Sequence, residues 1–222
     1  MRGLQRTGMT VAALTALLLL SSAGATLALD INPPEWRGLP GTTWQGWEFN
    51  VNDTMPPADI GDNRYGNPIA FVNPIDPGWI ADLDGMQGVW PLSGEIYAEV
   101  PNTPFDPLHE KWIRVQLTWQ LEPDAVNPPL VEVVGTTPEI PGVPAQAVPV
   151  QEIQVGVGDW LHTTYEITLP ENPEMETIRI AGDIYVDELV IDTYCVPEPS
   201  SALLAAMSLV AVVGMTVRRR RR

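Results

Sequence analysis

The prolines of this chain limit the kinds of structure that it can form. All 23 lie between Pro33 and Pro199, and together with the glycines they divide that region into short pieces. Because proline disrupts a helix interior, long helices are disfavoured there, and strands joined by turns are favoured.

Between these breaks apolar residues recur with a period of two, which is typical of strands buried on one face. In residues 111–121 the apolar set is Ile113, Val115, Leu117, Trp119 and Leu121, and the alternating set is Trp112, Arg114, Gln116, Thr118 and Gln120. We expect the first set in the core and the second set in contact with water.

Similar runs occupy residues 44–51, 69–72, 86–90, 94–100, 130–134, 148–155, 161–169, 177–181 and 184–192. About ten short strands without intervening helices predict an all-β fold, a single antiparallel β-sandwich with a jelly roll as the preferred form. Residues 136–149, which contain four prolines, are expected to form a long loop.

The N-terminal residues have the pattern of a secretory signal peptide. Arg2 and Arg6 precede an apolar run at residues 11–20 and small residues at 21–25. We therefore expect a signal helix in residues 1–28, cleaved during export after Ala25 or Ala28, with a retained anchor as the alternative. The export machinery is then a partner, and residues 29–195 are the exported domain.

The C-terminal residues have the pattern of a membrane span. Residues 201–217 carry no charge and precede Arg218, Arg219, Arg220, Arg221 and Arg222. The run is near the lower limit for a helix that crosses a hydrocarbon core of ~30 Å. Clustered arginines stay on the cytoplasmic side, so we predict a transmembrane helix with the domain outside, and a buried core helix is the alternative.

A short motif precedes this run and consists of Val196, Pro197, Glu198, Pro199 and Ser200. The order of Pro-Glu-Pro, hydrophobic segment and arginine cluster resembles the PEP-CTERM sorting signal of Gram-negative bacteria. The resemblance covers residues 196–222 and implies recognition by an exosortase, a membrane enzyme. The protein would pass from the inner membrane to the cell surface or the exopolysaccharide matrix. A proline-rich linker before a plain anchor is the alternative.

Charge and cysteine content narrow the function further. Seven of the 12 basic residues lie in the two targeting segments, whereas all 28 acidic residues lie between Asp30 and Glu198. So acidic a domain repels nucleic acid, which excludes nucleic-acid binding. Cys195 is the only cysteine, so no intrachain disulfide is possible, and its thiol is either available for an interchain disulfide or simply at the end of a strand.

Residues 184–191 suggest a calcium site. They resemble the closing strand of carbohydrate-binding jelly rolls, in which an Asp among apolar residues can bind a structural calcium ion. The resemblance implies Asp187 as a ligand, with Glu48 or Glu35 as its partner from the N-terminal strand. The alternative places Asp187 on an exposed face or at a bulge.

Eight tryptophans are available, and a tryptophan face can stack on a sugar ring. We expect at least five of the eight in the core, since each buries ~200 Å². Trp112 falls on the polar side of its strand with Arg114 and Gln116, and these three form our candidate contact surface for extracellular polysaccharide.

Sequence motifs for catalysis are missing. The chain has no His-Glu-x-x-His and no Gly-x-Ser-x-Gly, and His162 is expected on the outward side of its strand. We therefore predict a surface or matrix protein that binds or structures polysaccharide and is not an enzyme. A secreted glycoside hydrolase or lyase with a jelly-roll fold is the alternative.

Overall fold

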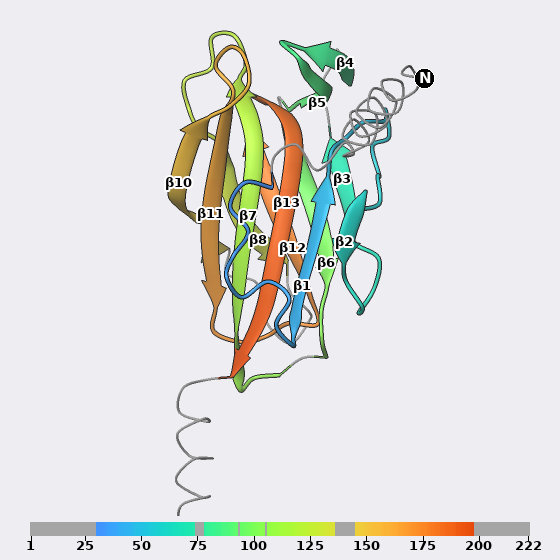
Figure 1. The fold of residues 1–222 in the computed structure, drawn as a ribbon, viewed down its shortest axis with the longest axis vertical. Coiled ribbons are helices and arrows are strands. Elements are labelled where there is room, and N and C mark those ends of the chain that lie inside the picture. Colours follow the sequence, from blue (N-terminus) through green and yellow to red (C-terminus); the bar gives the residue numbers. More distant parts are fainter. Residues whose placement is uncertain (1–29, 74–77, 93, 105, 136–144, 198–222) are drawn as a thin grey trace, which may run out of the picture. The chain divides into compact units, whose positions relative to one another are not determined.

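The computed structural model describes residues 30–73, 78–92, 94–104, 106–135 and 145–197, which are all strand, turn or irregular structure. The described residues from Ile31 onward belong to one compact unit. The strands form two antiparallel sheets that enclose a common core, as in a β-sandwich (Figure 1). The predicted all-β, antiparallel architecture is confirmed for these residues, which contain no helix.

The larger sheet has eight strands. Its main path is β10 (Val148–Gln154), β11 (Leu161–Leu169), β7 (His109–Leu121), β13 (Ile184–Pro197), β1 (Thr42–Trp47) and β2 (Ile60–Asp62). Beside this path β5 (Met86–Pro91) pairs with both β13 and β4 (Ile80–Leu83). The two longest strands, β7 and β13, therefore lie next to each other in the middle of the sheet.

The smaller sheet has five strands in the order β3 (Ile69–Asn73), β6 (Gly94–Pro101), β12 (Met175–Gly182), β8 (Leu130–Gly135) and β9 (Ala145–Gln146). On its outer face Arg179 donates to Glu95 and Glu132 at 2.5 and 2.6 Å. These cross-strand ion pairs join β12 to both of its neighbours.

The core lies between the two sheets, as the alternation in residues 111–121 predicts. Ile113, Val115, Leu117 and Trp119 are all buried, and they belong to one core cluster with Ile96 and Ile178 of the smaller sheet and with other apolar residues of both sheets. Each such side chain contributes about 2 kcal/mol of burial free energy, which makes this interface the main source of stability.

The opposite side of β7 is only partly exposed to solvent, which corrects the prediction that all of its polar side chains contact water. Gln116 and Thr118 are buried, and His162 on β11, expected at the surface, is 2% exposed. His162 is hydrogen-bonded to both of the others, with its Nδ1 3.0 Å from the Thr118 hydroxyl and its Nε2 3.3 Å from Oε1 of Gln116. The segment of residues 31–41 crosses this face and covers part of it, as the blue trace shows (Figure 1).

The tryptophans divide between core and outer face. Trp47, Trp90, Trp119 and Trp160 are buried, and Trp79 packs against the core cluster, which agrees with the expectation of at least five. The other three, Trp36, Trp44 and Trp112, are half-buried or exposed.

The prediction of a loop over residues 136–149 extends too far toward the C-terminus. Residues 136–144 lie outside the described part of the chain, but β9 and β10 already occupy residues 145–146 and 148–154. Pro149 sits inside β10, at an irregularity in its pairing with β11. Because β10 is an edge strand, a missing backbone donor is tolerated there.

The targeting segments lie mostly outside the described residues, which include neither the predicted signal peptide at 1–28 nor the predicted span at 201–217 and its arginines. In the described part of the chain, no helix is long and apolar enough to cross a membrane. Of the sorting motif, Val196 and Pro197 are described, and both belong to β13, where they pair with Glu110 and His109.

Candidate functional site

A cleft of about 370 Å³ opens on the outer face of the larger sheet. It is lined by Trp36, Glu110, Trp112, Ile113, Arg114, Glu166, Ile167 and Thr168. Trp112 and Arg114 lie on the outward side of β7, and their cross-strand partners on β11 are Thr168 and Glu166. The strand register therefore places one aromatic ring and one ion pair side by side.

Aromatic rings form one wall of the cleft. Tyr194 is the neighbour of Trp112 on β13, and the two rings meet edge to face with centroids 6.1 Å apart. Trp36, from the segment of residues 31–41, stacks on Tyr194 with ring centroids 5.6 Å apart and an angle of 23° between the rings. The Trp112 side of this group remains accessible, since Trp112 is 38% exposed.

The segment that supplies Trp36 is held by a buried ion pair. Arg37 donates through Nε and Nη2 to the two carboxylate oxygens of Asp192, the Nη2 distance being 2.6 Å. The Asp192 side chain is fully buried and that of Arg37 is 17% exposed. The guanidinium also lies 4.7 Å from the ring centroid of Trp44, a cation–π contact.

Asn32 fixes the same segment over the middle of the sheet. Its backbone N–H donates to Oε1 of Gln116 at 2.7 Å, and its amide donates to Oε1 of Gln151 at 2.6 Å. Its carbonyl oxygen accepts from Nη1 of Arg114 at 3.2 Å, while Nη2 of Arg114 donates to Oε1 of Glu166 at 2.5 Å. Arg114 thus joins the segment to the cleft.

Two of the three predicted contact residues meet in the cleft. Trp112 and Arg114 line it, but Gln116 is 1% exposed and serves to hold Asn32. Sequence reasoning missed Trp36, Glu110 and Glu166. Glu166 could have been found only from the β7–β11 register, in which it faces Arg114, and Trp36 only from the path of an irregular segment.

The cleft combines the groups that sugar recognition requires. The Trp112 ring offers an apolar face, Glu166 is half-exposed and accepts hydrogen bonds, and Arg114 donates them. Glu110, another carboxylate of the cleft, accepts from Nε1 of Trp112 at 3.3 Å, which orients that ring. Chemically the site suits a neutral polyhydroxylated ligand.

A second feature lies at a β-bulge in β13. The β13–β7 register shifts between Val186 and Glu188, so Asp187 is the extra residue, as the alternative reading of the sequence has it. Asp187 is 8% exposed. Burial, and after it the negative charge of Glu48, raise the pKa of Asp187 to about 7, against the opposing effect of a hydrogen bond with the Gln87 backbone.

Asp187 and Glu48, the predicted calcium ligands, are therefore close enough to interact. Glu48 is positioned by its neighbours, because its carboxylate accepts from Asn50 at 2.7 Å and its backbone N–H donates to Asp59 at 2.8 Å. Glu35, the alternative partner, has an exposed side chain in a turn. Within the described ranges no group of three His, Cys, Asp or Glu side chains is placed to hold a metal ion.

Comparison with protein-family models finds no match, and comparison with curated proteins finds none either. The resemblances to a PEP-CTERM signal and to carbohydrate-binding jelly rolls therefore remain predictions from the residues that carry them.

Proposed function

We propose that this protein binds extracellular polysaccharide through the cleft beside Trp112, at the cell surface or in the exopolysaccharide matrix. The observation that carries the proposal is the outward-facing Trp112 next to the Arg114–Glu166 pair, in a cleft of 370 Å³. A shallow site with one aromatic platform and flanking polar groups fits a sugar ring, whose two sides are apolar and whose edge is hydroxylated. A jelly-roll arrangement of the two sheets is part of this proposal.

The bulge supports a structural role for calcium within the same proposal. Asp187 and Glu48 supply two carboxylates whose mutual repulsion a divalent cation would relieve. Calcium takes six to eight oxygen ligands in roughly this kind of site, so backbone carbonyls and water would have to complete the shell. The pair therefore fits one part of such a site, and the ion would stabilise the fold without taking part in sugar binding.

Replacing Trp112 by alanine is expected to weaken polysaccharide binding by about tenfold or more, equivalent to ~1.4 kcal/mol, because the stacking platform is lost. The measurement is affinity for a glycan panel that includes the exopolysaccharide of the producing cell. Tyr97→Ala is the matched control, since Tyr97 lies on the outer face of the other sheet and its loss should leave affinity unchanged.

Two outcomes of that measurement would count against the proposal. If the wild-type protein bound no glycan on the panel, nor the cell's own polymer, polysaccharide binding would be wrong. If Trp112→Ala and Tyr97→Ala lost affinity equally, the cleft would not be the polysaccharide-binding site.

A glycoside hydrolase or lyase is the second candidate, because Glu110 and Glu166 place two carboxylates in the same cleft. Glycoside hydrolysis needs such a pair, one carboxyl acting as acid and the other as nucleophile or base. Release of soluble sugar from the bound polymer, abolished by Glu110→Gln or Glu166→Gln, would establish this candidate instead.

Export and sorting form the remaining part of the proposal. The signal peptide directs the chain to the export machinery, the helix at residues 201–217 holds it in the inner membrane, and an exosortase recognises residues 196–200. Replacing Arg218 to Arg222 by serine, or Pro197 and Pro199 by alanine, should cause unprocessed chain to accumulate in a Gram-negative host that contains an exosortase. Immunoblots of membrane and surface fractions would measure this.

The matched control for the tail is a variant with Pro107 and Pro123 replaced by alanine, two prolines in exposed turns of the domain. It should be processed and delivered as the wild type is. Normal processing of the tail variants would show that residues 196–222 are a plain anchor.

A further inference from the structure

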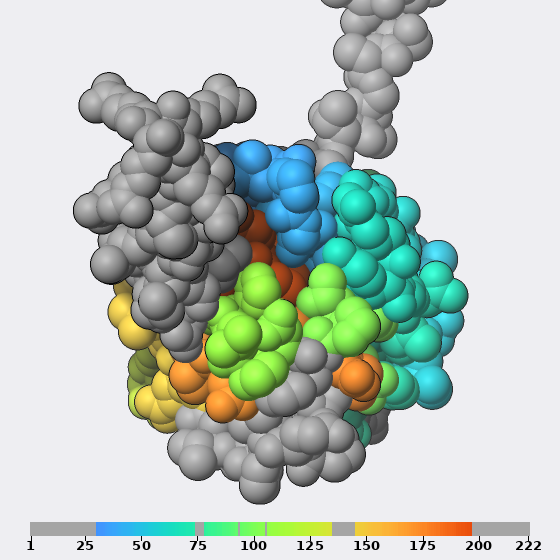
Figure 2. All heavy atoms as spheres, turned by 90° about the horizontal axis from the view of Figure 1, so that it is seen from below, coloured from blue at the N-terminus to red at the C-terminus, as the bar shows by residue number. Residues whose placement is uncertain are grey.

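Lys111, the only lysine of the chain, is buried inside the sandwich. It occupies the inward side of β7 next to Cys195 on β13, and its side chain is 1% exposed. Lysine is rarely found so deep in a protein, because removing its ammonium group from water is costly. Lys111 is the third residue of β7, and Figure 2 shows the end of the sandwich at which β7 begins and β13 ends.

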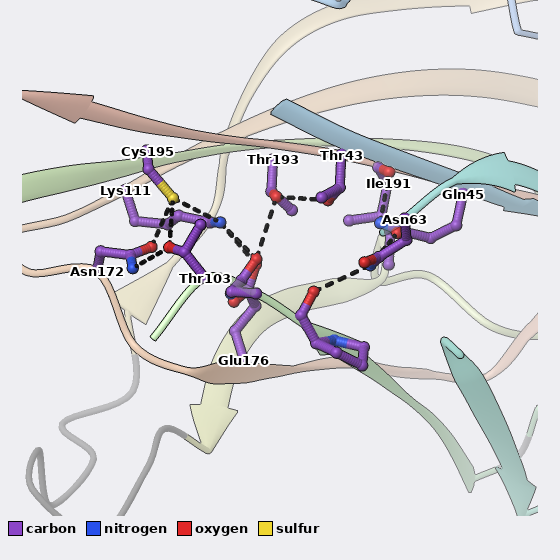
Figure 3. A network of polar contacts seen from close by, with 12 residues as sticks. Thr43, Gln45, Asn63, Thr103, Lys111, Asn172, Glu176, Ile191, Thr193 and Cys195 are labelled. Atoms are coloured by element: carbon purple, nitrogen blue, oxygen red, sulfur yellow. Dashed lines mark hydrogen bonds and ion pairs between the residues drawn. The ribbon is translucent and has the colours of Figure 1, made fainter. Parts of the chain in front are cut away.

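Two further polar side chains meet Lys111 there. Nζ of Lys111 donates to Oδ1 of Asn102, directly after β6, at 2.5 Å, and it lies 3.7 Å from Oε1 of Glu176 on β12 (Figure 3). Asn102 is 7% exposed and Glu176 is fully buried. One side chain from the larger sheet thus reaches two groups that belong to the smaller sheet.

The hydrogen bonding of this cluster is incomplete. Among the described residues, neither carboxyl oxygen of Glu176 nor Nδ2 of Asn102 has a hydrogen-bond partner. Burial raises the pKa of Glu176 to about 7, although the charge of Lys111 lowers it. Buried polar groups without hydrogen-bond partners cost free energy of folding. The non-covalent contacts among Lys111, Glu176 and Asn102 leave that cost uncompensated, so they do not explain why these three side chains are buried together.

The rest of the network holds the three groups in place. The Asn102 backbone N–H donates to the Glu174 carbonyl at 2.8 Å. The thiol of Cys195 is 3.5 Å from Nζ and donates to Oδ1 of Asn172 at 2.8 Å, and the Asn172 amide donates to the Thr103 hydroxyl (Figure 3). These contacts fix the positions of Nζ and of the Asn102 side chain relative to each other.

We propose that Lys111 and Asn102 become joined by an isopeptide bond, in a reaction that Glu176 assists by carrying a proton. The C=O bond is about 1.23 Å long, so Nζ lies within about 3.7 Å of Cγ of Asn102, close to the distance from which a nucleophile attacks.

The reaction balances without a cofactor or an oxidant. The neutral amine of Lys111 attacks Cγ of Asn102, and the new Nζ–Cγ bond replaces the bond from Cγ to Nδ2. Glu176 takes the proton that Nζ loses and returns one to Nδ2, which leaves as ammonia. A dry interior favours the neutral forms of amine and carboxyl, which are the forms that this step needs.

The test uses the full-length protein, purified in detergent and digested with trypsin after denaturation. Unmodified chain gives a peptide that covers residues 65–111. The linked chain resists cleavage at Lys111 and gives residues 65–114 with a mass lower by one ammonia, about 17 Da. An amine-reactive label applied after denaturation should also fail to modify Lys111. Cleavage and labelling at Lys111 with no loss of mass would overturn the proposal.

Three variants make the assignment specific. Glu176→Gln should abolish the mass loss, and Asn102→Asp should lose water, about 18 Da, in place of ammonia. Cys195→Ser is the matched control, because the thiol contacts Nζ without bonding in the reaction, and it should keep the link. A succinimide at Asn102 also removes one ammonia, but it leaves Lys111 open to trypsin and label, and that result would contradict the proposal even if a variant failed to fold.

Discussion

Arg37→Ala is expected to lower the free energy of unfolding by about 3 to 5 kcal/mol, a large share of the stability of a domain of this size. The reason is that Asp192 remains fully buried after the guanidinium that neutralises it has gone. A charge left inside without its partner costs more than the pair contributes. Urea unfolding, followed by tryptophan fluorescence, measures the effect as a lower midpoint.

The control and the second variant separate charge from packing. Arg64→Ala removes an exposed arginine and should change stability by less than about 0.5 kcal/mol. Arg37→Ala combined with Asp192→Asn should recover part of the lost stability, because the buried carboxylate that Arg37 neutralises is then replaced by a neutral amide. If the single and double variants unfolded alike, the packing of Arg37 on Trp44 would be the important contact.

The same substitution should also affect binding. Trp36 precedes Arg37 and lines the cleft, so release of the segment of residues 31–41 would displace one of its walls. Arg37→Ala is therefore expected to weaken polysaccharide binding even at temperatures at which the variant is folded.

Asp187→Asn is expected to raise the stability of the protein at pH 8 in the presence of a calcium chelator. The pKa of Asp187 is raised to about 7 from an ordinary value of 3.8. The folded protein therefore holds this proton more tightly than the unfolded chain does. Stability from this group is fully present below pH 3.8 and is lost as the pH rises to about 7, by about 4 kcal/mol at most.

Thermal unfolding from pH 4 to pH 8 measures this effect. The stability difference between variant and wild type should grow with pH and level off above pH 7. Glu176 is present in both proteins and its raised pKa has an effect of the same sign, so its contribution cancels in this difference. Asp82→Asn, an exposed carboxylate on β4, is the matched control and should behave as the wild type does. A difference independent of pH would contradict the explanation by Asp187.

Calcium gives the same pair of proteins a second readout. If Asp187 and Glu48 bind the ion, millimolar calcium should raise the unfolding temperature of the wild type and leave that of Asp187→Asn unchanged. Absence of a shift in the wild type would refute the calcium site without changing the pH result.

Local patterns predict the strands of this fold well. The alternation in residues 111–121 identifies both the strand and its inner face, because a strand buried on one side imposes that period directly. The same alternation assigns Lys111 to the inner face beside Ile113. Lysine is usually exposed, however, and the local pattern does not reveal the Asn102 and Glu176 side chains that meet Lys111 inside the sandwich.

The outer face is where local patterns fail. Gln116 and His162 read as exposed because polar residues alternate with apolar ones. The structure buries them beneath a layer of hydrogen-bonded side chains and an irregular segment. The path of residues 31–41 depends on partners more than 80 positions away, such as Gln116 for Asn32, and no local period records that. For the same reason Trp36, which this segment brings to the cleft, could not be predicted.

The central place of β13 affects when the protein can fold. This strand pairs with β7, β1 and β5, which all precede it by more than 60 residues. During synthesis the larger sheet therefore has a gap in its middle until residue 197 is available, and β1 has no long partner before then. If the chain is exported as we propose, it should cross the membrane in an unfolded state and close its sandwich only afterwards. Folding and delivery would thus be coupled by the order in which the strands are made.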